Sequence, residues 1–231
     1  MAAVVLAGGL GTRLRPVVMD RPKVLAEVGG RPFLAYILDQ LDQTGMREVV
    51  LCTGYMAESI WRAFGDRFRS LTLKYSEEIQ PLGTGGALRQ ALPYCFSDSI
   101  LVLNGDSFIN ADLGGYCEWF YENDLETAIL LTMVPDASRF GRVTVREDGL
   151  IMRFEEKSGH HDAGLINAGV YILKKDVVLS IPEGRRFSLE RQLFPKLTGK
   201  SLYGYLTMGS FIDIGTPESY LSAEEFFKIA R

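Results

Sequence analysis

The sequence has few residues that could form disulfide bonds or histidine metal sites. Its 231 residues include 3 cysteines and 2 histidines. Cys52, Cys95 and Cys117 cannot all pair with one another, and none lies in a Cys-x-x-Cys motif, so we expect reduced thiols in a reducing compartment. Because His160 and His161 are adjacent, they cannot easily face one ion, and this favours a solvated loop over a metal site.

Long apolar runs and a strong excess of one charge are also absent. No stretch approaches the ~18 apolar residues of a membrane span. The run from Ala2 to Ala7 is too short for the core of a signal peptide, and no basic region precedes it. The formal net charge of −4 makes the chain a poor candidate for unspecific binding to nucleic acid or to a membrane surface. We therefore expect a cytoplasmic protein whose partners are small molecules.

The composition is that of a globular protein, with 47% apolar and 23% charged residues. A chain of this length buries roughly 70–75% of its unfolded surface, which is enough for a single domain over residues 1–231. Over the first half, short buried strands alternate with helical spacing, and this predicts a doubly wound, mostly parallel α/β sheet. The expected strands are 1–7, 48–53, 71–75 and 99–103, and the expected helices are 32–43, 56–64 and 84–92.

The second half is less regular and predicts a smaller, more antiparallel lobe. The turn signal Glu147-Asp148-Gly149 lies between apolar segments 141–145 and 150–154, as in an antiparallel hairpin. No linker rich in Pro, Gly or Ser separates the halves, whose boundary we place near residue 110. Further strands are expected at 127–134, 165–173 and 202–206, and a helix is expected to begin within 188–194.

A glycine-rich loop follows the first strand. Its glycines allow backbone amides to approach a phosphate, and Arg13 and Lys23 add cations for the same anion. The spacing is GGxG, which is neither the dinucleotide fingerprint GxGxxG nor a P-loop ending in Gly-Lys-Ser/Thr. A plain strand-to-helix turn is the structural alternative. The candidate nucleotide-binding residues of the loop are Leu6, Ala7, Gly8, Gly9, Gly11 and Thr12.

Two aspartates are candidate magnesium ligands. Asp106 follows the expected strand 99–103, at the edge where open α/β sheets bind ligands, although a lone Asp there also caps helices. Asp213 lies between apolar residues, where an unpaired charge is costly. One Mg²⁺ held by both carboxylates would offset that cost, because Mg²⁺ prefers one or two carboxylates together with phosphate oxygens and water.

The segments LAGGLGTRLRP and RPKVLAEVGGRPFL resemble the sugar-1-phosphate nucleotidylyltransferases, and the resemblance extends over the whole chain. It implies a Rossmann-like fold and the synthesis of a nucleotide sugar from a nucleoside triphosphate and a sugar 1-phosphate, with release of pyrophosphate. It also implies Mg²⁺ as cofactor on Asp106 and Asp213, catalytic roles for Arg13, Lys23 and Asp106, and homo-oligomers.

The same resemblance implies further site residues. The loop that begins the helix at PLGTGG encloses the nucleobase in this family, which implicates Gln80, Gly83 and Thr84. The smaller lobe would bind the sugar. Its candidates for the sugar phosphate are Gly141, Glu156, Lys157 and Asn167, although a charged strand end such as Glu156-Lys157 is also typical of a solvated surface. Ser158 replaces a proline that is frequent in the family.

The implied chemistry needs no strong general base, because a phosphate monoester oxygen is already ionised near pH 7. Catalysis would come from positioning two polyanions and neutralising charge on the leaving pyrophosphate. A nucleotide-sugar sensor is an alternative, although a sensor has no need of the two metal-ligating aspartates. A dinucleotide-dependent oxidoreductase is another, although Thr53-Gly54 stands where its acidic residue is expected.

Within the family, one short group resembles this sequence throughout. It consists of guanylyltransferases that act on D-glycero-α-D-manno-heptose 1-phosphate for bacterial surface polysaccharide. The shared pieces imply GTP as the nucleotide, with mannose 1-phosphate or other sugar phosphates and nucleotides as alternatives. These pieces are PLGTGG, LNGDS, FEEK, GLINAGVYIL, FSLE and FIDIG, at residues 81–86, 103–107, 154–157, 164–173, 187–190 and 211–215.

Overall fold

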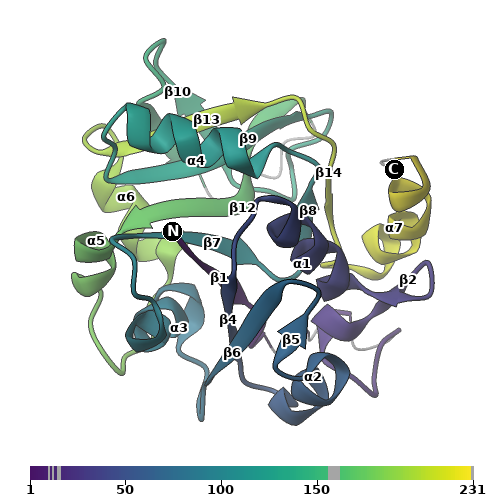
Figure 1. The fold of residues 1–231 in the computed structure, drawn as a ribbon. Helices are drawn as coiled ribbons and strands as arrows, with labels where there is room; N and C mark the ends of the chain where they lie inside the picture. Colours follow the sequence, from purple (N-terminus) through teal and green to yellow (C-terminus); the bar gives the residue numbers. More distant parts are fainter. Residues whose placement is uncertain (10, 12, 15–16, 156–161, 230–231) are drawn as a thin grey trace.

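The computed structural model describes residues 1–9, 11, 13–14, 17–155 and 162–229. A large mixed sheet crosses the molecule (Figure 1), and its strand order is β11-β10-β12-β7-β1-β4-β6-β5, with β9 and β13 attached through β12. The first half confirms the predicted alternation, with β1 pairing in parallel with β4 and β7, and β4 with β6. Its elements are β1 (Ala2–Leu6), α1 (Phe33–Gln43), β4 (Glu48–Thr53), α2 (Ala57–Phe64), β5 (Arg67–Phe68), β6 (Leu71–Glu77), α3 (Gly83–Ala91) and β7 (Ser99–Asn104).

The second half extends the sheet mainly by antiparallel pairing, as the sequence predicts. The strand β12 (Gly164–Lys174) pairs antiparallel with both β7 and β9. The expected antiparallel hairpin around Glu147-Asp148-Gly149 is also formed. The strand β13 (Leu202–Thr207) pairs in parallel with β9. These strands are β9 (Thr127–Val134), β10 (Arg142–Val145), β11 (Ile151–Glu155), β12 (Gly164–Lys174) and β13 (Leu202–Thr207).

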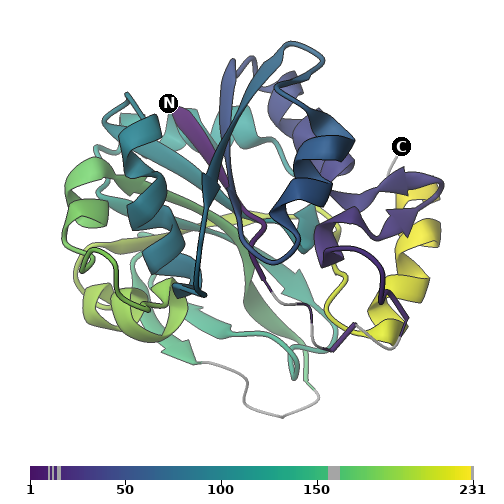
Figure 2. The ribbon, with the colours of Figure 1, turned by 90° about the horizontal axis from the view of Figure 1, so that it is seen from below.

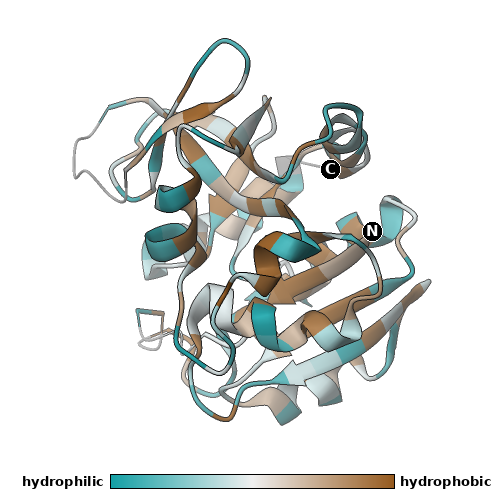
Figure 3. Ribbon diagram, turned by 90° about the vertical axis from the view of Figure 1, so that its left-hand side faces the viewer, coloured by the Kyte–Doolittle hydropathy of each residue, from teal (hydrophilic) through white to brown (hydrophobic). Residues whose placement is uncertain are grey.

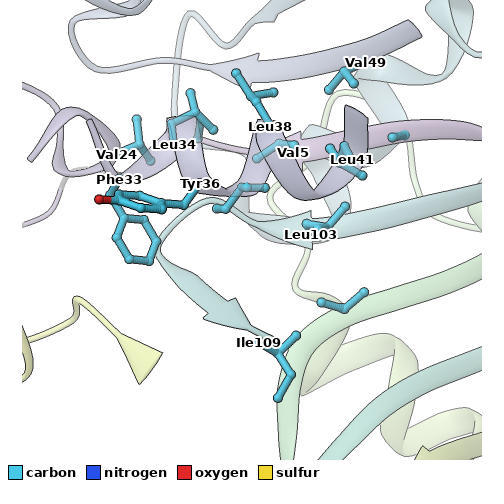
Figure 4. Packing of buried hydrophobic residues seen from close by; sticks show 14 of the residues in the cluster. Val5, Val24, Phe33, Leu34, Tyr36, Leu38, Leu41, Val49, Leu103 and Ile109 are labelled. Atoms are coloured by element: carbon cyan, nitrogen blue, oxygen red, sulfur yellow. The ribbon is translucent and has the colours of Figure 1, made fainter. Parts of the chain in front are cut away.

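Both faces of the central strands are apolar, so helices cover both (Figures 1 and 2). In β1, Val5 belongs to the cluster that packs on α1, whereas Val4 belongs to the cluster that packs on α3. This alternation follows from the two-residue period of a strand. Figure 4 shows Val5, Val49 and Leu103 in the first cluster together with side chains of α1. In Figure 3 the central strands are mainly hydrophobic, whereas many loops and outer helix turns are hydrophilic.

Several elements were not anticipated from the sequence. The helix expected from 188–194 begins as a π-type turn, η3 (Leu189–Leu193), and continues as the short α6 (Phe194–Leu197). Two small ribbons also form, β2 with β3 and β8 with β14. The remaining elements are η1 (Lys23–Leu25), β2 (Glu27–Val28), β3 (Arg31–Pro32), η2 (Leu92–Tyr94), β8 (Ser107–Ile109), α4 (Leu113–Glu122), α5 (Lys175–Leu179), β14 (Phe211–Asp213) and α7 (Pro217–Ile229).

The fold also bears on the state of the cysteines and on the length of the helices. All three cysteines are free thiols, and burial raises the pKa of both Cys95 and Cys117 to about 11. Among the described residues, no helix has the length and apolarity needed to cross a membrane.

The N-terminus of α3 packs closely against residues 185–189. Phe187 donates its backbone N–H to the carbonyl of Leu82 at 2.7 Å, and its own carbonyl accepts from Gly85 and Gly86 at 2.9 and 3.1 Å. A Cβ on Gly83 would lie 2.7 Å from the Phe187 carbonyl oxygen, and Gly83 has a φ of +73°. This position therefore needs glycine for both conformation and space.

We predict that Gly83→Ala destabilises the protein more than Gly45→Ala. Gly45 has a similar φ of +77°, but a Cβ there would meet nothing within 4 Å. Both substitutions place alanine at a positive φ and so carry a similar backbone cost. The difference between their free energies of unfolding should therefore reflect overpacking against Phe187, which costs about 1–3 kcal/mol. Urea unfolding of both variants measures it. Equal free energies of unfolding for Gly83→Ala and Gly45→Ala would show that residues 185–189 can move away from the new methyl group without cost.

Candidate functional site

A cavity of about 440 Å³ opens at the carboxyl ends of the parallel strands. Such an edge is where open α/β sheets bind ligands. The cavity combines the glycine-rich loop, the end of β7 and the N-terminus of α3. It is lined by Leu6, Ala7, Gly8, Gly9, Gly11, Lys23, Val24, Glu78, Pro81, Gly83, Thr84, Ala87, Asn104, Asp106 and Arg186.

Most of the predicted nucleotide-binding residues lie along this cavity, with two exceptions. Gln80 is exposed and is not among the lining residues, and Thr12 lies outside the described part of the chain. Glu78 and Arg186 line the cavity although no motif indicated them. Arg186 belongs to the segment that packs on α3, and that contact joins residues about a hundred positions apart, which no local pattern reveals.

Backbone contacts hold the glycine-rich loop against the sheet. Ala7 donates its N–H to the Cys52 carbonyl at 2.8 Å, and Gly105 donates to the Leu6 carbonyl at 2.9 Å. A Cβ on Gly8 would lie 2.6 Å from Glu78 Oε1. A Cβ at this position would therefore displace the Glu78 carboxylate from its place beside the loop.

Lys23 and Asp106 form an ion pair in the wall of the cavity. Lys23 Nζ donates to Asp106 Oδ2 at 2.7 Å, and the exposed fractions of the two side chains are 10% and 46%. The lysine stands on the short helix η1, whereas the aspartate follows β7. The pair keeps both charges beside the cavity, where a polyphosphate would attract the ammonium and a divalent cation would attract the carboxylate.

The segment of Asp213 lies beside that of Asp106, because β14 pairs with β8 and sets Asp213 opposite Ser107, although Asp213 is not among the residues that line the cavity. The backbone N–H of Ile214 donates to the Asp106 carbonyl at 2.9 Å. Arg139 Nη2 donates to both carboxylate oxygens of Asp213, at 3.0 and 3.2 Å. The guanidinium of Arg13 lies close by, with Nη2 3.7 Å from the place that a Cβ on Gly215 would take.

The two aspartates fit a magnesium ion in chemical terms. They come from neighbouring, hydrogen-bonded segments, and Mg²⁺ is usually held by one or two carboxylates plus substrate phosphates and water. Within the described residues no three His, Cys, Asp or Glu side chains cluster as a complete metal cage. Asp106 and Asp213 would therefore share the ion with a bound nucleotide.

A buried polar network lies beside the cavity. Tyr171 Oη donates to Glu190 Oε1 at 3.2 Å and accepts from the side-chain amides of Asn167 and Asn104 at 3.0 and 3.4 Å. Glu190 Oε2 accepts from Thr84 Oγ1 at 2.7 Å. Burial, and then the nearby Glu190 carboxylate, raise the pKa of Tyr171 well above its usual value, so its hydroxyl remains a donor.

The network connects predicted residues of both lobes. Thr84 begins α3, Asn104 ends β7, and Asn167 stands on β12. The N–H of Asn167 donates to the Gly141 carbonyl at 3.2 Å, so these two predicted sugar-phosphate residues are neighbours. Glu156, Lys157 and the His160-His161 pair lie outside the described residues, and the roles of Glu156 and Lys157 stay predictions.

The sequence model of the nucleotidyl transferase family matches residues 2–228, and the chain belongs to this family. It is 37% identical to the D-glycero-alpha-D-manno-heptose 1-phosphate guanylyltransferase of Aneurinibacillus thermoaerophilus, with 97% of each chain covered. It is also 35% identical to the mannose-1-phosphate guanylyltransferase of Mycobacterium tuberculosis, covering 95% of this chain and 62% of that protein.

Among solved structures, that of HddC from Yersinia pseudotuberculosis complexed with GMP-PN superposes with a TM-score of 0.87. The two sequences are 35% identical, and the match covers 98% of this chain and 99% of HddC. These comparisons confirm the resemblance to the nucleotidyltransferase family and the Rossmann-like fold that it implied.

We predict that Asp106→Asn and Asp213→Asn each lower kcat by about 10²-fold or more, the size of loss seen when a preorganised charge stabiliser is removed. Steady-state turnover measures this. Asp106→Asn should still fold, because the substituted side chain is half exposed and leaves the apolar core unchanged. Asp124→Asn is the control, since it removes an exposed ion pair to Lys174, and neither residue lines the cavity. Full turnover in either variant would exclude that aspartate from the site.

We predict that Tyr171→Phe lowers the free energy of unfolding by about 1–3 kcal/mol, because Glu190 Oε1 loses its donor and the side-chain amides of Asn104 and Asn167 lose their acceptor. Chemical denaturation measures the loss. A change below about 0.5 kcal/mol would show that water replaces the hydroxyl at no cost.

Proposed function

We propose that this protein is a magnesium-dependent guanylyltransferase that converts GTP and D-glycero-α-D-manno-heptose 1-phosphate to GDP-heptose and pyrophosphate. The observation that carries the proposal is the cavity in which the glycine-rich loop, Lys23 and Asp106 meet. Full-length similarity to a guanylyltransferase of this specificity supports the choice of substrates. The GMP-PN complex of HddC supports a guanine nucleotide.

The glycine-rich loop and Lys23 would bind the triphosphate. The loop brings backbone N–H groups to the cavity wall without side chains in the way, and the Lys23 ammonium is held there by Asp106. Arg13 lies with Arg139 around Asp213, beside the same region. As pyrophosphate leaves, its negative charge grows, and fixed cations that neutralise this charge lower the barrier.

The transfer itself makes one bond and breaks one bond. An ionised oxygen of the sugar phosphate attacks the α-phosphorus, and the bond from this phosphorus to the bridging oxygen of the β-phosphate breaks in line. No side chain must remove a proton, since a phosphate monoester has its second pKa near 6. When bound on Asp106 and Asp213, Mg²⁺ would neutralise phosphate charge and fix the triphosphate.

The sugar phosphate would enter from the side of β12. Asn167 and Gly141 are neighbours there, and Asn167 is oriented by Tyr171 and by the N–H of Gly169, which donates to Asn167 Oδ1 at 2.8 Å. Glu156 and Lys157 are proposed to bind the sugar phosphate on the same side. A cytoplasmic location, a role in surface polysaccharide synthesis and a homo-oligomeric state are part of the same proposal.

Mannose 1-phosphate is the second candidate substrate, because the chain is 35% identical to a mannose-1-phosphate guanylyltransferase over 95% of its own length. This candidate shares the nucleotide and the chemistry with the first one. It changes only the contacts of the smaller lobe with the sugar.

A matrix of nucleoside triphosphates against sugar 1-phosphates, scored by pyrophosphate release, tests the proposal. We expect GTP with the manno-heptose 1-phosphate to give the highest kcat/KM, with mannose 1-phosphate as a weaker substrate. Asp106→Asn is the control for release that does not depend on this site. A preference for UTP, dTTP or CTP would overturn the guanine assignment, and nucleotide binding without pyrophosphate release would favour a sensor.

A further inference from the structure

Asp213 is held by an arginine from the turn between β9 and β10. Arg139 lies in this turn, where the N–H of Phe140 donates to the Ala137 carbonyl at 3.1 Å. The Nη2 of Arg139 donates to Oδ1 and Oδ2 of Asp213 at 3.0 and 3.2 Å, and to Ser219 Oγ at 3.3 Å. Asp213 ends β14, and Ser219 lies in the first turn of α7. The arginine therefore joins three segments at one carboxylate.

An aromatic contact also holds this turn against β14. The ring of Phe140 packs edge-on against the ring of Phe211, with the centroids 5.3 Å apart. Phe211 begins β14, the strand that Asp213 ends. The guanidinium carbon of Arg139 lies 5.6 Å from the centroid of the Phe140 ring. Apolar packing therefore places the arginine beside the aspartate, and the ion pair does not depend on charge alone.

The contacts of Asp213 both orient and neutralise its carboxylate. Besides Arg139, Oδ2 accepts from the backbone N–H of Gly215 at 2.9 Å. The exposed fractions of the Asp213 and Arg139 side chains are 18% and 39%. Charge-assisted hydrogen bonds are stronger than neutral ones, so these contacts fix the direction of the carboxylate. A metal ion on Asp213 would meet an oriented ligand, but it would have to replace the guanidinium.

Each aspartate of the proposed metal site is paired with a cation, Asp106 with Lys23 and Asp213 with Arg139. A divalent cation that arrives alone gains little attraction from carboxylates that are already neutralised. A metal–triphosphate brings its own negative charge, and its phosphate oxygens can accept the hydrogen bonds that the aspartates give up. The charges therefore favour a metal that arrives with the nucleotide.

We propose that Arg139 is a positioning residue that orients Asp213 for the metal and keeps this carboxylate from binding a divalent cation without nucleotide. The inference rests on the proposed function, because it concerns the metal of that reaction. A purely structural ion pair makes a different prediction. If Arg139 only joined the turn to β14, removing its charge would lower stability and would not strengthen metal binding.

The test is titration with Mn²⁺, which takes the same oxygen ligands as Mg²⁺ and whose free form is measured by electron paramagnetic resonance. It compares the wild-type protein with Arg139→Gln, Arg139→Lys and the control Arg146→Gln, all without nucleotide. The control also removes one arginine from an ion pair with an aspartate, since Arg146 pairs with Asp148 on the surface and neither residue lines the cavity.

We expect Arg139→Gln to tighten Mn²⁺ binding by about 10-fold or more, because a unit charge beside the ligand no longer opposes the dication. Misfolding cannot produce such a gain. Arg139→Lys keeps the charge and should bind Mn²⁺ as the wild type does. Arg146→Gln should change the affinity by less than about 2-fold, because solvent and salt screen a distant surface charge.

The same substitution in an Asp213→Asn background shows whether the effect acts through Asp213. There Arg139→Gln should no longer tighten Mn²⁺ binding. The inference is wrong if Arg139→Gln binds Mn²⁺ no more tightly than the wild type, if Arg146→Gln gains as much, or if the gain persists without the Asp213 carboxylate.

A second titration separates this inference from the proposed function. Mn²⁺ is added to the wild-type protein in the presence of GDP. If the wild type binds Mn²⁺ with GDP but Arg139→Gln shows no gain, the inference fails and the proposed guanylyltransferase stands. If the wild type binds no Mn²⁺ with GDP, both are wrong.

Discussion

The parallel pairing of β1 with β4 on one side and β7 on the other is the constraint on which the site depends. It ends three strands at one edge and brings Leu6 beside Asn104 and Cys52. The hydrogen bond from Gly105 to the Leu6 carbonyl then holds the glycine-rich loop next to Asp106. A Cβ on Gly105 would lie 2.8 Å from that carbonyl oxygen, so the close approach of these segments depends on glycine.

Charge is distributed unevenly around the cavity that this constraint creates. Asp106 and Asp213, which follow β7 and end β14, are each paired with a cation, Lys23 and Arg139 respectively. The Glu78 carboxylate, after β6, accepts from the backbone N–H of Leu82 instead. When a metal–triphosphate binds, the two aspartates would exchange one partner for another.

Much of the fold was predictable from local patterns, because the spacing of apolar residues in a short segment is enough to indicate a buried strand or an amphipathic helix. The segment Glu48–Thr53 was predicted with the bounds that β4 has. The helix α4 was missed, although Leu113, Tyr116 and Phe120 have helical spacing and are its buried residues. The ribbon of β8 and β14 could not be predicted, since its strands are short and lie about a hundred residues apart.

The lining of the cavity was predictable where its residues lie in short sequence motifs. The glycine-rich loop, Lys23 and Asp106 line one cavity, as their sequence context suggested. Arg139, Glu190 and Tyr171 were missed because they pair with residues of other elements, which become neighbours only in the folded chain. Gln80 and Glu78 differ by two positions, yet only Glu78 lines the cavity. A loop of unknown conformation does not reveal which of its side chains turns inward.

The most direct test of the account is a crystal structure of the protein with Mg²⁺ and a non-hydrolysable analogue of GTP. We predict that the phosphates lie against Lys23 and the glycine-rich loop, the metal on Asp106 and Asp213, and the base at the start of α3. Density for the nucleotide at another surface, or a base turned away from the start of α3 with the Lys23–Asp106 pair intact, would contradict it.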